Sequence, residues 1–500
     1  MRGGLVVCGT TSDAGKSWLV AGLCRLLARR GVSVAPFKAQ NMALNAQVTA
    51  DGGEMGHAQW VQALAAGVPP ERAMSPVLLK PTGPRTCEVV VMGEVVAHRT
   101  APEHHATTAA LRPVVLGALA DLRRRFDVVI CEGAGAAAEI NLLDRDLANL
   151  PLAAAAGLPA IVVGDIDRGG VFAALHGTVD LLPDDLRRCV RGFVVNRLRG
   201  DPDLLGDACD QLEARSGVPT LGVIPMVPGT DIDAEDSLAL SRSDGRATAG
   251  TGPVLDVAAV CFPQVANFGD LDPLRLEPSV AVRWVRSAAD LGRPHLVVLP
   301  GSKATRDDLA WFRASGLAAA VEASGAVVVA VCAGLQMAGL RIEDPTGVEG
   351  APGGVDGLGW LPVATRFEGA KVLDRPRALV VDGPGAGHRA DGYRIHHGRV
   401  APVPGARTWL EDGDGAPIGW WSDRVAGTSL HAVLESDEVR AGVLRWAAAR
   451  AGVEAPALPG VGFAAARQAR LDRIADAVER HLDLDRIEAL IRSARPVAPV

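Results

Sequence analysis

The sequence lacks several features that would assign a protein to a common class. Its eight cysteines are scattered and form no C-x-x-C pair, which argues against a disulfide frame and a structural zinc site. The net charge is −7, with 51 basic and 58 acidic residues, so nothing favours general binding to nucleic acid or an anionic membrane. The most apolar stretches, 147–164 and 325–340, contain Asn, Pro or Gln and are typical of buried elements, not of membrane spans. The chain starts without a charged-then-apolar leader, so a cytoplasmic location is expected.

Aromatic residues are also scarce, at 4%, whereas glycine (57) and proline (33) are abundant in the 500 residues. Such a composition favours α/β layers built from Ala, Val and Leu, joined by tight loops. A chain of this length is too long for one core, so two or three domains are expected. Whether these chains form an oligomer is left open.

Short apolar, β-branched runs alternate with helical patterns in the first half. Continuous apolar runs suit a parallel sheet that is covered on both faces, so residues 1–235 are predicted to form a doubly wound α/β domain. Its strands are expected at 4–9, 32–38, 127–133, 160–167, 190–196 and 220–225. A polar, Gly-rich stretch follows and is interpreted as a linker over 236–252.

A second β-α series is predicted in 253–450, with strands at 254–263, 280–285, 295–301 and 326–334 and hairpin-like segments around 351–430. The tail, 451–500, carries helical periodicity over 469–491 and is expected to dock on a domain.

The loop "GTTSDAGKS" follows the first strand and leads into a helix predicted over 17–30. A phosphate-binding loop reads G-x-x-x-x-G-K-[ST], but here five residues separate Gly9 from Gly15. The flanking strand and helix still fit, so Gly15 and the helix N-terminus are expected to bind phosphate oxygens. Lys16 would neutralise them, and Ser17 is a candidate Mg²⁺ ligand.

Acidic residues at predicted strand ends support a nucleotide site. Glu132 closes one strand, and Asp165 and Asp167 follow the next. The carboxyl ends of parallel strands border the ligand crevice, where carboxylates can hold Mg²⁺ between phosphates. The alternative is that some of them cap helices or pair with Arg168 or Arg145.

The second half contains a candidate nucleophile. "AVVVAVCAGLQMAG" predicts a buried strand that turns at Cys332 into a helix, the thiol counterpart of a nucleophile elbow. Far downstream, "GTSLHAVLES" places His431 at a strand end, and a Cys with a distant His suits thiol acyl transfer. The alternative for Cys332 is a buried structural thiol. His396 and His397 are adjacent in a predicted strand and point to opposite faces, which disfavours a shared metal site.

The loop resembles that of the dethiobiotin synthetases, which carry the same extra residue and use Mg-ATP to phosphorylate a carboxylate-type group. The resemblance implies ATP-related roles for Lys38, Asp51 and Glu132, with Glu132 and Asp51 as metal ligands. Glu54 competes for the role of Asp51.

Longer segments, 34–67, 74–81, 132–150 and 165–173, resemble the cobyric acid synthase family of the cobalamin pathway. Two departures are His57, where the family usually has Arg, and Pro151, where it usually has Gly. The Cys332 and His431 motifs resemble a class I glutamine amidotransferase domain. Many class I enzymes place Glu two residues after the His, where this chain has Val433, and Glu435 is a candidate to orient the ring.

This resemblance covers Leu5 to about Arg450 and implies an amidoligase that uses ATP, Mg²⁺ and glutamine. The implied reaction amidates carboxylates b, d, e and g of adenosylcobyrinic acid a,c-diamide, with Cys332 as nucleophile and His431 as proton shuttle. One alternative is an a,c-diamide synthase. Another, from a different class, is a non-catalytic ATP-dependent switch similar to partitioning ATPases, with a dead amidotransferase-like domain.

Overall fold

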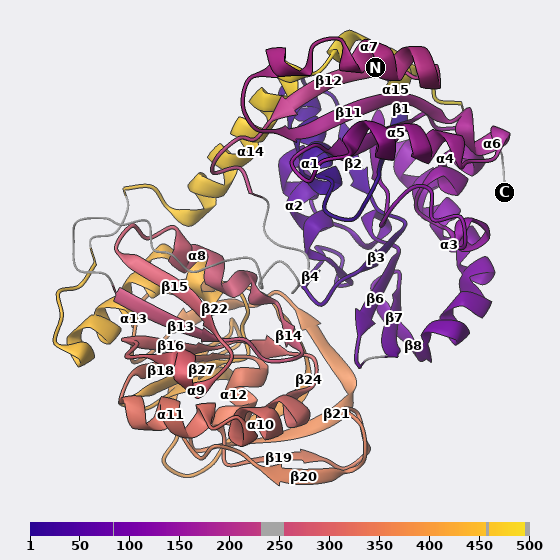
Figure 1. Cartoon of the computed structure of the whole chain (residues 1–500). Coiled ribbons are helices and arrows are strands. Elements are labelled where there is room, and N and C mark those ends of the chain that lie inside the picture. The colour runs from indigo at the N-terminus through magenta and orange to yellow at the C-terminus, as the bar shows by residue number, and fades with distance from the viewer. Residues whose placement is uncertain (84, 232–254, 457–459, 496–500) are drawn as a thin grey trace. The chain divides into compact units, whose positions relative to one another are not determined.

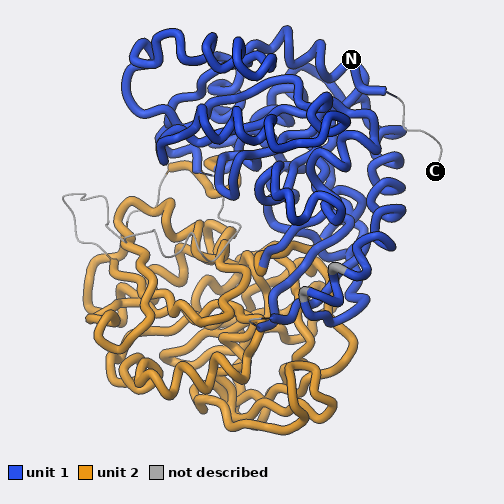
Figure 2. Tube along the Cα trace, turned by 45° about the vertical axis from the view of Figure 1, so that its right-hand side comes forward, with its two compact units in different colours: residues 1–43, 49–232, 467–500 blue, residues 44–48, 233–466 orange. Residues whose placement is uncertain are grey.

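The computed structural model describes residues 1–83, 85–231, 255–456 and 460–495, and the predicted linker lies outside them (Figure 1). The chain forms two compact units (Figure 2). Unit 1 comprises residues 1–43, 49–232 and 467–500, and unit 2 comprises 44–48 and 233–466. In the described part of the chain, no helix is long and apolar enough to cross a membrane.

Unit 1 is built on a six-stranded parallel sheet in the order β12-β11-β10-β1-β9-β2. The six strands predicted in the first half all belong to it, so the predicted parallel sheet is confirmed. Its strands are β1 (Gly3–Gly9), β2 (Val34–Phe37), β9 (Val128–Glu132), β10 (Ala160–Asp165), β11 (Val190–Leu198) and β12 (Thr220–Pro225). Their side chains are largely buried, as continuous apolar runs require.

Helices separate these strands along the chain and pack against them. Helix α1 contacts β1, β2 and β9, while α5 contacts β10 and β11. The helices of the connections are α1 (Lys16–Arg29), α2 (His57–Ala66), α3 (Ala101–Arg125), α4 (Leu150–Ala156), α5 (Val171–Asp180), α6 (Asp184–Arg187) and α7 (Ala208–Ser216). Helix α3 begins with a capping box, in which Thr100 and Glu103 bond reciprocally.

A second, four-stranded sheet in unit 1 has no counterpart in the predicted strands. It has the order β3-β6-β7-β8 and comprises β3 (Gln40–Met42), β6 (Val77–Pro81), β7 (Thr86–Val91) and β8 (Glu94–Thr100). Strands β6, β7 and β8 are joined as antiparallel neighbours. Two further short strands lie between β3 and α2, namely β4 (Ala46–Val48) and β5 (Glu54–Gly56).

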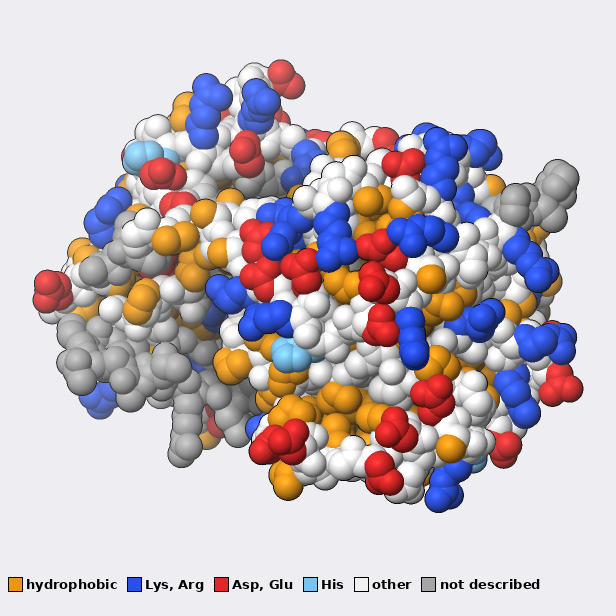
Figure 3. Space-filling view, turned by 90° about the horizontal axis from the view of Figure 1, so that it is seen from above, with side chains coloured by type: hydrophobic (Ala, Val, Ile, Leu, Met, Phe, Trp, Pro, Cys, Tyr) orange, Lys and Arg blue, Asp and Glu red, His pale blue; other side chains and the backbone are white. Residues whose placement is uncertain are grey.

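The tail forms two helices, α14 (Phe463–His481) and α15 (Leu484–Arg492), where one helical pattern was predicted. The break lies at Asp483, whose side chain accepts a hydrogen bond from the Arg486 N–H and so caps α15. Side chains of α1 pair with α14, as in the bidentate contact of Arg25 with Asp472 at 2.8 and 3.0 Å. Acidic and basic side chains likewise lie side by side on the face shown in Figure 3.

Unit 2 contains a nine-stranded mixed sheet in the order β15-β13-β16-β18-β27-β26-β25-β22-β23. Its first five strands are parallel, and antiparallel pairs continue from β27 to β23. The strands are β13 (Leu255–Val260), β15 (Val280–Val285), β16 (Leu296–Leu299), β18 (Val327–Val331), β22 (Arg377–Val380), β23 (Arg389–Asp391), β25 (Arg407–Glu411), β26 (Pro417–Trp421) and β27 (Val425–Thr428). The four strands predicted at the start of the second half all belong to this sheet.

The Gly/Pro-rich part of unit 2 contributes a four-stranded sheet in the order β20-β19-β21-β24. It comprises β19 (Arg341–Asp344), β20 (Gly353–Asp356), β21 (Val363–Asp374) and β24 (Arg394–Pro402), while β14 (Val265–Ala266) pairs with β17 (Gly301–Ser302). The helices are α8 (Asp272–Arg275), α9 (Ala288–Leu291), α10 (Thr305–Ala314), α11 (Leu317–Ser324), α12 (Ala333–Ala338) and α13 (Asp437–Ala451). Strand β18, in the parallel part of the large sheet, ends directly before the candidate nucleophile, Cys332.

Candidate active sites

The Gly-rich loop of unit 1 lies between β1 and α1. Lys16 Nζ donates to the carbonyl oxygens of Thr11, at 2.9 Å, and Gly135, at 2.8 Å, so its ammonium group lies over the loop. Gly15 precedes α1 with φ 99°, and a Cβ there would lie 2.0 Å from the Asn196 side chain. Only glycine therefore allows the backbone to close at this point. This arrangement fits the predicted role of the loop, in which backbone N–H groups and Lys16 would bind phosphates.

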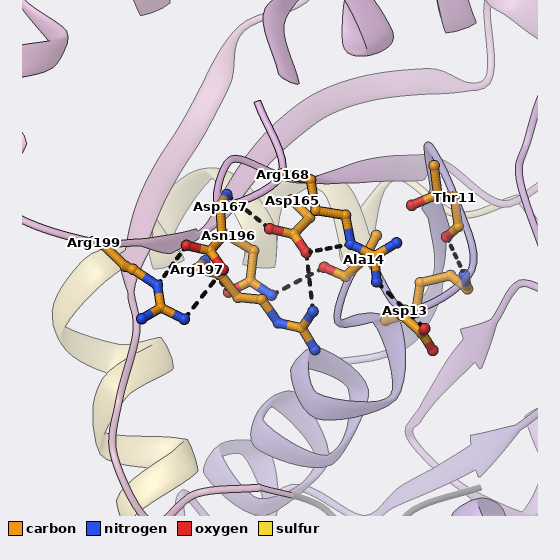
Figure 4. Close-up of polar contacts among 10 residues, drawn as sticks. Thr11, Asp13, Ala14, Asp165, Asp167, Arg168, Asn196, Arg197 and Arg199 are labelled. Carbon is orange, nitrogen blue, oxygen red and sulfur yellow. Dashed lines mark hydrogen bonds and ion pairs between the residues drawn. The ribbon is translucent and has the colours of Figure 1, made fainter. Parts of the chain in front are cut away.

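A set of paired charges lies beside the loop (Figure 4). Asp165 Oδ2 is 3.0 Å from Arg197 Nη1 and 3.4 Å from Arg168 Nε, and Arg168 also reaches Asp13 at 3.4 Å. Asp167 pairs with Arg199. The two aspartates therefore occur as ion-pair partners of arginines, which is the alternative stated above for Asp165.

Glu132 is the centre of a buried network at the end of β9. Its Oε1 accepts from Ser17 Oγ at 2.8 Å and from Lys38 Nζ at 2.9 Å, and its Oε2 accepts from Gln62 Nε2. The Lys38 and Glu132 side chains are 5% and 1% exposed. Burial alone would raise the pKa of Glu132, but the Lys38 charge and the hydrogen bonds lower it. The structure thus brings together Ser17, Lys38 and Glu132, and keeps the carboxylate charged.

The other two candidate metal ligands lie in different surroundings. Asp51 lies in the turn before β5, where its Oδ2 is 3.2 Å from Arg72 Nε and its backbone oxygen accepts from Arg72 Nη2. None of the contacts found for Asp51 in the described residues joins it to Ser17 or Glu132. Glu54 is fully buried and contacts Lys80 Nζ. An Mg²⁺ role for Asp51 stays a prediction.

The two departures from the resembled family fit their local structure. His57 is the first residue of α2 and stacks on Trp60, with ring centroids 5.7 Å apart. Pro151 lies in the first turn of α4, where a helix tolerates proline because that N–H has no helical partner.

Cys332 lies at a sharp turn between β18 and α12. Its φ is 53° and ψ is −108°, a conformation that a non-glycine residue rarely adopts and that is typical of a nucleophile elbow. Its N–H donates to the Thr428 oxygen of the neighbouring strand at 2.8 Å. A Cβ on Gly334 would lie 2.2 Å from the Leu299 oxygen, so glycine is required for the helix to approach the sheet. The elbow predicted from the sequence is therefore present.

His431 follows β27 and is completely enclosed. Its Nδ1 is 2.7 Å from Asp270 Oδ2, and Asp270 Oδ1 accepts from the Ala432 N–H at 2.6 Å. The two side chains are 1% and 2% exposed. Burial by itself would lower the pKa of His431, but the charges of Asp270 and Cys332 and their hydrogen bonds raise it to about 10. The structure thus brings Asp270 onto the His431 ring, whose pKa Cys332 also influences, and the roles of Cys332 as nucleophile and His431 as base stay predictions.

The ring of His431 is fixed from several sides. Tyr393 stacks on it at a centroid distance of 5.1 Å and an interplanar angle of 18°. The backbones of Tyr393 and His431 also exchange hydrogen bonds at 2.9 and 3.3 Å. Val433, at the position where many class I enzymes have Glu, is buried, and the carboxylate at Nδ1 comes from Asp270 instead of Glu435.

His396 and His397 of β24 lie in different surroundings. His397 Nδ1 is 3.1 Å from the Glu368 oxygen, whereas burial, followed by the charge of Arg394, lowers the pKa of His396 to about 3. Among the residues that the structure describes, no group of three or more His, Cys, Asp or Glu side chains is arranged to hold a metal ion.

Sequence reasoning missed two residues of these sites. Asp270 lies in "NFGDLDPL", which has no pattern that ties it to His431, and the two are 161 positions apart. Gln62 lies within an otherwise ordinary helical stretch. Only the folded structure reveals the link. The turn after β14, which carries Asp270, lies beside the strand end of the nine-stranded sheet from which His431 extends.

Comparisons with known proteins cover both halves of the chain. A family model for the CobQ/CobB/MinD/ParA nucleotide binding domain matches residues 5–238, and one for the CobB/CobQ-like glutamine amidotransferase domain matches 256–439. The chain is 48% identical to a cobyric acid synthase of Nocardia farcinica, with 99% of this chain and 98% of that protein covered. The cobyric acid synthase of Frankia casuarinae is 47% identical, with 99% of this chain and 98% of that protein covered. That of Sorangium cellulosum is 45% identical, with 98% of this chain and 99% of that protein covered. A phosphate loop, a Cys-His-Asp site and full-length likeness at this level lead to one conclusion: the chain belongs to the cobyric acid synthase family.

Proposed function

We propose that this enzyme converts adenosylcobyrinic acid a,c-diamide to adenosylcobyric acid by amidating the carboxylates b, d, e and g. ATP activates each carboxylate and glutamine supplies the nitrogen. A carboxylate does not form an amide with ammonia unaided, because its oxygen is a poor leaving group. Ammonia, in turn, is mostly protonated at neutral pH. The two sites of this chain address these two obstacles separately.

The glutaminase half uses Cys332, His431 and Asp270. The thiolate of Cys332 attacks the side-chain amide carbon of glutamine, and the tetrahedral intermediate collapses as the imidazolium of His431 donates its proton to the leaving nitrogen. Ammonia departs and a glutamyl thioester remains. His431 then takes a proton from water, which attacks the thioester and releases glutamate and the thiol. Asp270 keeps the Nδ1 proton of His431 in place and stabilises the imidazolium.

The ATP half uses the loop around Lys16 and the Glu132 network. A substrate carboxylate oxygen attacks the γ-phosphorus, which gives an acyl phosphate and ADP; ammonia then attacks the carbonyl carbon and expels phosphate. Lys16 and Lys38 hold ATP by charge. Ser17 Oγ and the Glu132 carboxylate lie within 2.8 Å of each other and are hard oxygen donors that suit Mg²⁺. When bound, that ion neutralises phosphate charge, and Asp51 is kept as a predicted further ligand.

The observation that carries the proposal is the thiol site. Cys332 at an elbow with positive φ, facing a His431 that Asp270 holds, fits thiol acyl transfer and is hard to explain as a structural thiol. The nucleotide loop in the same chain supplies the activation that an amide ligase needs. Cobyric acid synthases similar over nearly the whole chain support the choice of substrate.

The test is mass spectrometry of the corrinoid product formed with ATP and glutamine. Four amidations of the a,c-diamide are expected, and two amidations of cobyrinic acid would instead establish an a,c-diamide synthase. Cys332→Ala is expected to abolish turnover with glutamine and to spare turnover with ammonium. Equal loss of both would refute the division of labour. The cytoplasmic location stays an expectation.

A further inference from the structure

Asn267 contacts the reactive nitrogen of His431. It lies just before the short 3₁₀ helix η5 (Phe268–Leu271), with φ 53° and ψ 38°, and its side chain is buried. Its Nδ2 is 3.3 Å from His431 Nε2, the nitrogen left over once Nδ1 pairs with Asp270. In the proposed mechanism this nitrogen exchanges a proton with the Cys332 thiol, so Asn267 competes for the atom on which glutaminase chemistry depends.

The orientation of that amide is set by residues from the other half of the sequence. Ala46 N–H donates to Asn267 Oδ1 at 2.8 Å, which leaves Nδ2 to face the imidazole. Asn45 Oδ1 accepts from the Phe268 N–H at 3.2 Å. Segment 44–48 belongs to unit 2, whereas the residues before and after it, up to 43 and from 49, belong to unit 1 (Figure 2).

An amide N–H can bond only to an unprotonated Nε2. With Nδ2 facing it, a proton on Nε2 would place two donors against each other, so this contact weakens, without cancelling, the preference for the imidazolium that Asp270 and Cys332 create. The ring cannot turn to avoid the clash, because Tyr393 stacks on it and Asp270 holds Nδ1. A Cβ on Gly301 would lie 3.1 Å from His431 Cε1, so the backbone also confines it.

We propose that Asn267 is a positioning residue that restrains the glutaminase site, and that segment 44–48 controls it. This inference deepens the proposed function and rests on it. While Ala46 holds Oδ1, the amide donates to Nε2 and disfavours the thiolate–imidazolium pair. When the segment shifts, the amide can rotate and present Oδ1 to the protonated Nε2. Because the segment is continuous in sequence with unit 1, acceptor or ATP binding there has a covalent route to the thiol site.

The test is the rate at which iodoacetamide alkylates Cys332 in the full-length protein at pH 7, followed by peptide mass spectrometry. Burial raises the pKa of each of the other seven thiols, which slows their reaction. Asn267→Gly removes the side-chain amide, and glycine tolerates the positive φ at this position. Asn267→Asp keeps an oxygen that accepts from the Ala46 N–H and places its second carboxylate oxygen next to Nε2. Gln264→Ala, in the same connection after β13, is the matched control.

Alkylation is expected to be about 2- to 12-fold faster in Asn267→Gly, the worth of one neutral hydrogen bond, and faster still in Asn267→Asp. A loosened turn alone would expose the thiol equally at every pH, so labelling is followed from about pH 5 to 9, where loss of the Nδ2 contact is expected to shift the midpoint of the profile to lower pH. An unshifted midpoint in both variants would overturn the proposal. Asn45→Ala, which loosens the same turn from the segment side, is expected to give a smaller increase; no increase would exclude control by the segment.

A second measurement tests the link to unit 1. Adding ATP, Mg²⁺ and the a,c-diamide is expected to speed labelling of Cys332 in the wild type and to change it little in Asn267→Gly. An equal ligand effect in both would overturn the proposed control. If Cys332 is not labelled in any protein, the failure lies in its assignment as the nucleophile, which separates the two hypotheses.

Discussion

The Asp270→Asn substitution tests the thiol site most directly. Asp270 uses both oxygens: Oδ1 accepts from the Ala432 N–H and Oδ2 faces His431 Nδ1. In the asparagine variant, Oδ1 has to remain with the Ala432 N–H, because the reverse orientation sets N–H against N–H in a buried site. The amide nitrogen then faces Nδ1, which moves the ring proton to Nε2. His431 in that tautomer cannot accept the proton of the Cys332 thiol.

The size of the effect follows from the charge environment of His431. The pKa of His431 is raised although burial opposes protonation, so the charges and hydrogen bonds around the ring outweigh the cost of burial. Asp270 is the largest of the favourable contributions, ahead of Cys332. Losing most of it, together with the wrong tautomer, should lower kcat for glutamine by about 10³-fold, or ~4 kcal/mol.

The assay compares glutamate release with ADP formation driven by ammonium chloride. The glutamine-dependent rate should fall while the ammonium-dependent rate stays within about twofold. Asp272→Asn, two residues away and paired with Arg275, removes the same charge outside the site and serves as the control. If Asp270→Asn keeps more than a tenth of the glutaminase rate and remains folded, His431 does not depend on this carboxylate.

Three further predictions concern buried charges. Lys38→Met leaves the Glu132 carboxylate buried without its cation and should lower the free energy of unfolding by about 3–5 kcal/mol in urea titrations. Adding Glu132→Gln to this variant should restore much of that free energy but not ATP-dependent turnover. Arg440→Met should destabilise the protein similarly, because the Arg440 and Glu277 side chains are 2% and 0% exposed and only 2.6 Å apart; unchanged thermal unfolding would refute this. His396 stays neutral when folded but binds a proton when unfolded, so stability should fall as pH drops from 6.5 towards 3, by about 1.4 kcal/mol per pH unit from this group, and His396→Gln should flatten that slope.

The sheets could be predicted from the sequence because parallel strands are buried on both faces. Strand β18 reads VVVAV and β9 begins VVIC, and such continuous apolar runs can be recognised without knowledge of the neighbouring strands. The sheet β3-β6-β7-β8 was missed because strands of three to seven residues, partly exposed, carry weaker patterns. The order of the strands within each sheet depends on tertiary contacts, which local sequence patterns do not specify.

The residues of the candidate sites also divide into those that local sequence patterns indicate and those that only the fold brings together. Cys332, Lys16 and Ser17 were predicted as candidates because local geometry dictates their neighbours: an elbow needs Gly334, and a phosphate loop needs Gly15. Asp270 was not, since the carboxylate approaches His431 from a turn far away in the sequence. Gln62 was missed for the same reason, because only the packing of α2 brings it to Glu132.

The carboxylate that bonds to His431 comes from a turn far away in the sequence and not from position 433, and this difference affects how the two can move relative to each other. A Glu at position 433 would sit two residues after His431 and move with it. Asp270 instead lies three residues after Asn267, so a single turn contacts both ring nitrogens, Nδ1 through Asp270 and Nε2 through Asn267. Segment 44–48 bonds to the first two residues of that turn. A displacement of the segment therefore changes the partner of Nε2 first, while the Ala432 N–H still holds Asp270 on Nδ1. On this arrangement, control can act on the proton that His431 shares with Cys332 without dismantling the support that orients the ring.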